Sequence, residues 1–147
     1  MIAQDLYLLD TNVVVELIRG NRRGKYIDEK FKLLRSIDTL HISVVTIGET
    51  LALARSLGWG KEKSEALKSI LRRLIILDIN NDEILNAYAS IDHYSLRSGV
   101  RMGKNDVWIA ATAHASETVL LTSDRDFDHL DGKWIDRVWI DPDDRAI

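Results

Sequence analysis

Short apolar runs alternate with longer stretches of helical periodicity along the chain. Five runs of four or five residues carry mostly aliphatic or aromatic side chains, and such runs are typical of buried strands in a parallel sheet. They occupy residues 6–10, 40–43, 74–78, 119–122 and 137–140. The pattern therefore predicts five short strands.

The segments between these runs place apolar residues at helical spacing. We expect helices over residues 11–19, 26–37, 45–57 and 61–73, one capped by Asn81-Asp82 that stops near Gly99, and one capped by Asn105 or Asp106. Strands that alternate with helices predict an α/β fold with a central parallel β-sheet and helices on both faces. In such folds ligands bind beyond the carboxyl ends of the strands.

Composition narrows the class of protein. A chain of 147 residues with 46% hydrophobic content predicts a single globular domain over residues 1–147. It has no cysteine, which excludes disulfides, thiolate zinc sites and cysteine nucleophiles. No signal peptide is evident, and no apolar run approaches the ~20 residues needed to span a bilayer. We therefore expect a cytoplasmic protein with no membrane partner. The net charge of −3 does not indicate a globally basic nucleic-acid binder.

Four acids stand where folding alone explains them poorly, because each adjoins an apolar segment. They are Asp10, Glu49, Asp106 and Asp124. An ionised carboxylate in apolar surroundings is costly unless something compensates it. Hard cations such as Mg²⁺ and Mn²⁺ take oxygen ligands, so acids that converge on such a cation would explain all of them together.

Each acid also has a purely structural interpretation. Asp10 and Asp106 are suitable helix caps, Glu49 suits the surface of a helix, and Asp124 suits a turn. These four interpretations must hold independently, whereas one shared site accounts for all four residues. The sequence thus favours the shared site.

Four motifs in order resemble a known family. They cover residues 8–12 (LLDTN), 48–49 (GE), 105–113 (NDVWIAATA) and 121–127 (LTSDRDF). Together they resemble the PIN domain, with the closest likeness to toxins of the VapC type. The resemblance implies a Mg²⁺- or Mn²⁺-dependent endoribonuclease, an RNA substrate, a cognate small antitoxin protein and a homodimer.

The same resemblance implies roles for individual residues. Asp10, Glu49 and Asp106 match the catalytic, metal-centred acids, and Asp124 matches the fourth. Asp126 lies in the same motif and is the alternative fourth acid. Polar positions that support the site are matched by Thr11, Asn12, Thr122 and Ser123.

Phosphodiester chemistry agrees with this assignment. A metal ion lowers the pKa of a bound water and clamps phosphate oxygens, so neither a serine nucleophile nor a histidine pair is required. Cations just before Asp106 are candidates for holding the RNA backbone: Arg97, Arg101 and Lys104.

Other functions remain open from the sequence. A catalytically weak PIN-like module that binds RNA or protein is one alternative, and a PIN nuclease of housekeeping RNA processing is another. A phosphoryl-accepting receiver domain fits less well. It needs paired acids at the end of the first strand, where this chain offers only Asp10.

Overall fold

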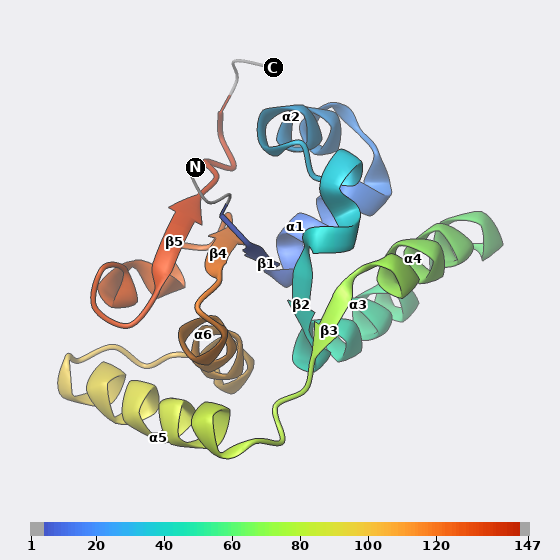
Figure 1. Ribbon diagram of the computed structural model, residues 1–147. Coiled ribbons are helices and arrows are strands. Elements are labelled where there is room, and N and C mark those ends of the chain that lie inside the picture. The colour runs from blue at the N-terminus through green and yellow to red at the C-terminus, as the bar shows by residue number, and fades with distance from the viewer. Residues whose placement is uncertain (1–4, 145–147) are drawn as a thin grey trace.

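A parallel β-sheet forms the centre of the computed structural model, which describes residues 5–144 (Figure 1). Its five strands in that part of the chain are β1 (Tyr7–Leu9), β2 (His41–Ser43), β3 (Ile75–Leu77), β4 (Val119–Thr122) and β5 (Asp136–Trp139), in the spatial order β3-β2-β1-β4-β5. Every pairing is parallel. The five predicted strands are confirmed, each within one residue of its expected ends.

Neighbouring residues of the central strands point to opposite faces of the sheet, as strand geometry requires. Leu8 and Leu120 belong to one hydrophobic core, while Leu9 and Leu121 belong to the other. All four side chains are fully buried. A sheet with apolar residues on both faces needs a cover on each face, and this is why the strand runs read as continuously apolar.

Helices supply that cover on both faces, which confirms the expected fold class (Figure 1). The Leu9 face packs against α1 (Thr11–Arg19), α2 (Arg22–Phe31), α3 (Val44–Ser56) and α4 (Lys61–Arg73). The Leu8 face packs against α5 (Asp82–Arg97), α6 (Lys104–Ser116) and the 3₁₀ helix η2 (Arg125–Leu130).

Two expectations about the helices were wrong. The helix predicted over residues 26–37 is instead α2 followed by a separate 3₁₀ helix, η1 (Leu34–Thr39). The break occurs because Lys32 adopts a left-handed conformation (φ 55°) and the Asp28 side chain accepts a hydrogen bond from the Leu34 amide. Asn21 begins α2 early because its side chain accepts from the Gly24 amide.

The helix cap expected at Asn105 or Asp106 is also wrong, because α6 begins one residue before this pair. Gly103 is the residue that precedes the first turn. Asp106 consequently lies inside the first turn, where a carboxylate interacts favourably with the positive end of the helix dipole.

The carboxyl ends of the strands set the position of the site. Asp10 directly follows β1, and Ser123 and Asp124 follow β4, which pairs with β1. These residues therefore lie at one end of the sheet. Within residues 5–144, no helix combines the length and apolarity needed to cross a bilayer.

Candidate active site

Asp10 is the most deeply buried acid of the site, with 4% of its surface exposed. It caps α1, since its Oδ1 accepts a hydrogen bond from the Thr11 amide at 2.8 Å. Its Oδ2 accepts from the Thr122 hydroxyl at 2.7 Å. Burial raises the pKa of Asp10 to about 6; the two hydrogen bonds oppose the rise, and the charges of Asp124 and Glu49 add to it. This carboxylate therefore caps α1 and also carries a charge that its buried, acidic surroundings disfavour.

Thr122 links the two strand ends. Besides donating to Asp10, its Oγ1 accepts a hydrogen bond from the Asp124 amide at 2.9 Å. The Asp124 side chain then caps η2 by accepting from the Asp126 amide at 2.9 Å. One hydroxyl therefore fixes the distance between the acid after β1 and the acid after β4.

Ser123 is held through its backbone and contributes no hydroxyl contact to the acids. Its amide donates to Asn12 Oδ1 at 3.4 Å, and its carbonyl accepts from Trp139 Nε1 at 3.2 Å. Asn12 on α1 thus braces the loop after β4. These contacts give Asn12 and Ser123 a supporting place beside the acids.

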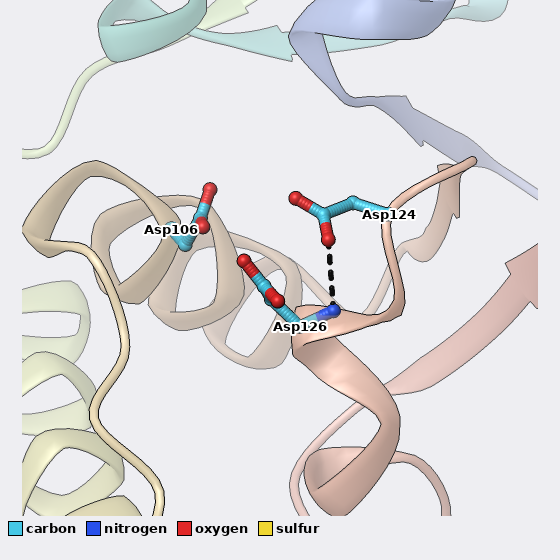
Figure 2. A group of neighbouring side chains, drawn as sticks. All are labelled: Asp106, Asp124 and Asp126. Carbon is cyan, nitrogen blue, oxygen red and sulfur yellow. Dashed lines mark hydrogen bonds between the residues drawn. The ribbon is translucent and has the colours of Figure 1, made fainter.

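Asp106 reaches the same region from the first turn of α6, and Figure 2 shows Asp106, Asp124 and Asp126 pointing toward one another. One oxygen from each lies within 4.8 Å of the other two. Burial, and after it the charges of Asp10, Asp124, Asp126 and Glu49, together raise the pKa of Asp106 to about 7. The pKa of the exposed Asp126 is also raised, by desolvation first and then by Asp124.

Glu49 approaches from α3 and is held by two donors. The Thr11 hydroxyl donates to its Oε1 at 2.8 Å, and the Asn105 side-chain amide donates to its Oε2 at 3.3 Å. Both carboxylate oxygens therefore have fixed directions. Thr11 follows Asp10 and Asn105 precedes Asp106, so Glu49 is tied to the segments that carry two of the other acids.

A cleft of about 320 Å³ lies at this site. All four predicted acids are present there, with Thr11 and Asn12. Asp126 belongs to the close oxygen cluster but is absent from the residues that line the cleft. Asp124 is the member common to both groupings, together with Asp106.

The donor set suits a hard divalent cation. Its ligand atoms are carboxylate oxygens from separate elements, which is the coordination that Mg²⁺ and Mn²⁺ prefer. The raised pKa values of Asp10 and Asp106 show that these charges are poorly compensated by the protein itself. A bound cation would offset burial and mutual repulsion at once.

The three cations predicted to contact RNA lie outside this cleft. Arg97 occupies the last turn of α5, and Arg101 is exposed in the loop that follows. Lys104 begins α6 and places its Nζ 3.4 Å from Asp92 Oδ1. The Lys104 ammonium thus lies beside an acid of α5, and the RNA contact of these three residues stays a prediction.

Sequence reasoning missed Glu16 and Arg19, which line the cleft on α1. A signal for them exists in the periodicity of this helix. Positions 12, 16 and 19 share one helical face and carry the polar side chains of a helix whose remaining interior residues are buried aliphatics. Periodicity places this polar stripe on one face that begins beside Asp10, and the packing of α1 on the sheet turns that face toward the cleft.

Comparison with known proteins places this geometry in a family context. Residues 7–133 match the family described as PIN domain. Ribonuclease VapC1 of Haemophilus influenzae (strain R2866) is 29% identical over 133 residues, covering 89% of this chain and 97% of that protein. Ribonuclease VapC2 of H. influenzae (strain ATCC 51907) is 29% identical over 132 residues, covering 84% and 91%.

Solved structures agree with the sequence matches. VapBC-1 from nontypeable H. influenzae has a TM-score of 0.72 at 26% identity, covering 90% of this chain and 96% of that one. VapBC2 from Rickettsia felis, bound to a DNA fragment from its promoter, has a TM-score of 0.71 at 24% identity, covering 92% and 98%. The second likeness concerns the fold alone.

Proposed function

This chain belongs to the PIN-domain family, and on that premise we propose that it is a Mg²⁺- or Mn²⁺-dependent endoribonuclease, the toxin of a type II toxin–antitoxin pair. One observation carries the proposal. Carboxylates from four separate segments, Asp10, Glu49, Asp106 and Asp124, converge on one cleft at the carboxyl end of the parallel sheet. Relatives that match over most of this chain bear the name Ribonuclease VapC.

Asp10, Glu49, Asp106 and Asp124, which all line the cleft, would hold the cation. When bound, the ion supplies positive charge to the phosphate oxygens and acidifies a coordinated water. Thr122 orients Asp10 and the loop of Asp124, while Thr11 and Asn105 orient Glu49. The chain's own contribution is thus a set of acids in which Asp10 and Glu49 are held in fixed directions before substrate arrives.

Asp124 is the better candidate for the fourth acid. It lines the cleft, and its amide is anchored to the same hydroxyl that holds Asp10. Asp126 is exposed and reaches the cluster from the start of η2. We assign Asp126 a supporting role, in which it adds negative charge near Asp106.

The proposal extends to partners and location. RNA is the substrate, and a small antitoxin inhibits the toxin by inserting a cation, typically an arginine, among the acids, because arginine pairs bidentately with carboxylates. Solved relatives include a toxin–antitoxin complex from Klebsiella pneumoniae, although its 22% identity speaks for the fold alone. We expect a homodimer in the cytoplasm and a single PIN-like domain over residues 1–147, of which 1–4 and 145–147 lie outside the described residues.

Cleavage of RNA by the purified protein tests the catalytic half of the proposal. Activity should appear with Mg²⁺ or Mn²⁺, cease in EDTA, and be abolished by Asp10→Asn. Asp136→Asn is the matched control. Asp136 is an exposed acid at the start of β5, and the acidic site lies at the other end of the parallel strands. Full activity in EDTA would refute metal dependence.

The same assay separates the alternatives. A catalytically weak PIN-like module would bind RNA or protein yet leave RNA uncut under every metal condition. A nuclease of housekeeping RNA processing would cut RNA but would neither arrest growth when expressed alone nor copurify with a small protein. A toxin should arrest growth, and co-expression of the adjacent small reading frame should relieve the arrest.

A further inference from the structure

The acidic cleft contains a single positive charge among its described lining residues, and it belongs to Arg19. This residue ends α1, the helix that Asp10 caps at its other end. Its side chain retains 38% exposure, so the guanidinium is accessible to a molecule that enters the cleft. Four other lining residues are the acids assigned above, and Glu16 adds a fifth carboxylate.

The packing of α1 fixes the direction in which Arg19 points. Val13, Val14 and Leu17 on this helix are buried in the core against the sheet. The polar face with Asn12, Glu16 and Arg19 must therefore turn away from that core, toward the cleft that all three line. Gly20 closes the helix in a left-handed conformation (φ 59°), which leaves Arg19 in its final turn.

Glu16 holds Arg19 from one turn earlier on the same helix. Its Oε1 lies 3.7 Å from Arg19 Nη1, and its Oε2 is buried with no hydrogen-bond partner among the described residues. An ion pair whose atoms are 3.7 Å apart and whose arginine stays partly exposed contributes little to stability. Its consequence is instead to restrict where the guanidinium lies.

A cation inside the cleft favours the entry of an RNA strand. The acids repel a polyanion, and at physiological ionic strength charges more than about 8 Å away are largely screened. Arg97 and Arg101 do not line the cleft, and Lys104 is paired with Asp92. Arginine also matches phosphate geometry, since its guanidinium donates two parallel hydrogen bonds.

We propose that Arg19 binds a backbone phosphate of the RNA strand within the acidic cleft, and that Glu16 is a positioning residue for Arg19. This inference rests on the proposed ribonuclease function and names a substrate contact for it. The contact recognises phosphate, so it contributes affinity and placement of the strand without reading its sequence.

Binding of a short single-stranded RNA to the Asp10→Asn protein across a salt series tests the phosphate contact. Arg19→Gln should weaken binding roughly threefold or more and lower the slope of log affinity against log salt by about 0.7, the value for one single-strand phosphate contact. Arg19→Lys should restore the slope, because it restores the charge. Arg72→Gln, at an exposed position of α4, should change neither quantity.

Two further measurements separate a substrate contact from a structural one. In the active protein, Arg19→Gln should raise KM several-fold and leave the melting temperature within about 1 °C of wild type. Glu16→Gln should also raise KM, and should add nothing once Arg19 is already glutamine, because its effect runs through that side chain. A change in melting temperature without a change in KM would assign the pair to stability alone.

The possible failures are distinguishable. A protein that cuts RNA with an unchanged salt slope in Arg19→Gln overturns this inference and leaves the proposed function intact. A protein that never cuts RNA, yet loses slope in Arg19→Gln, overturns the proposed function and supports the phosphate contact. Absence of RNA binding by the Asp10→Asn protein overturns both.

Discussion

Asp10→Asn should stabilise the metal-free protein at alkaline pH while abolishing activity. The substitution keeps the size of a side chain that is 4% exposed and removes its charge. Burial, with the charges of Asp124 and Glu49, raises the pKa of Asp10 from 3.8 to about 6. A shift of this size corresponds to about 3 kcal/mol of unfavourable free energy in the ionised folded state.

Asp10→Asn removes this unfavourable free energy, but it also removes part of the hydrogen bonding that the carboxylate accepts. Asp10 accepts from the Thr11 amide and the Thr122 hydroxyl, and an amide oxygen replaces only one of these acceptors. That loss costs about 1–2 kcal/mol. The net stabilisation is therefore about 1–2 kcal/mol, or an increase in melting temperature of about 3–6 °C for a chain of this size.

The dependence of stability on pH shows whether the charge of Asp10 causes the stabilisation. Because the pKa of Asp10 is higher in the folded than in the unfolded protein, the folded state binds more protons between these two values, and stability falls as pH rises from about 4 to about 6. Asp106, with a pKa raised to about 7, extends the fall to about pH 7. The advantage of Asp10→Asn should be absent near pH 4 and complete at pH 8.

Thermal unfolding in chelator at pH 4 and pH 8 measures this effect, with Asp136→Asn as the exposed-acid control. Added Mg²⁺ should then raise the melting temperature of wild type more than that of Asp10→Asn, because only wild type keeps every carboxylate. A clear drop in the metal-free melting temperature of Asp10→Asn at pH 8 would refute the reasoning and make the α1 cap the main role of Asp10.

Three further outcomes are expected. Thr122→Val should destabilise the protein by about 1–3 kcal/mol and move the acid limb of the pH–rate profile to higher pH, since Asp10 loses a hydrogen bond that lowers its pKa. An unchanged profile would contradict this role of Thr122. Asp124→Asn should reduce RNA cleavage more than Asp126→Asn, and the reverse ranking would reassign the fourth acid. Gly24→Ala should destabilise by about 1–3 kcal/mol in chemical denaturation, because its Cβ would lie 2.1 Å from the Glu16 carbonyl oxygen; wild-type stability would show that α1 and α2 separate readily.

The local pattern of the chain determined most of the architecture. Buried parallel strands read as short apolar runs, and α4 occupies the predicted residues 61–73 because helical periodicity is a local signal. The acids after β1 and β4 were also recognisable, because adjacent parallel strands end on the same side of a sheet. Asn81 marked a helix start for the same reason, because capping depends on a few neighbouring residues.

Only the tertiary structure decided how these acids are held. Thr122 reaches Asp10 across 112 positions of sequence and Thr11 reaches Glu49 across 38, so no local pattern could encode either contact. The same holds for Lys104, which Asp92 draws toward α5, and for Arg19, whose place in the cleft depends on how α1 packs on the sheet. Sequence periodicity determines which residues share a face, but long-range packing determines what that face meets.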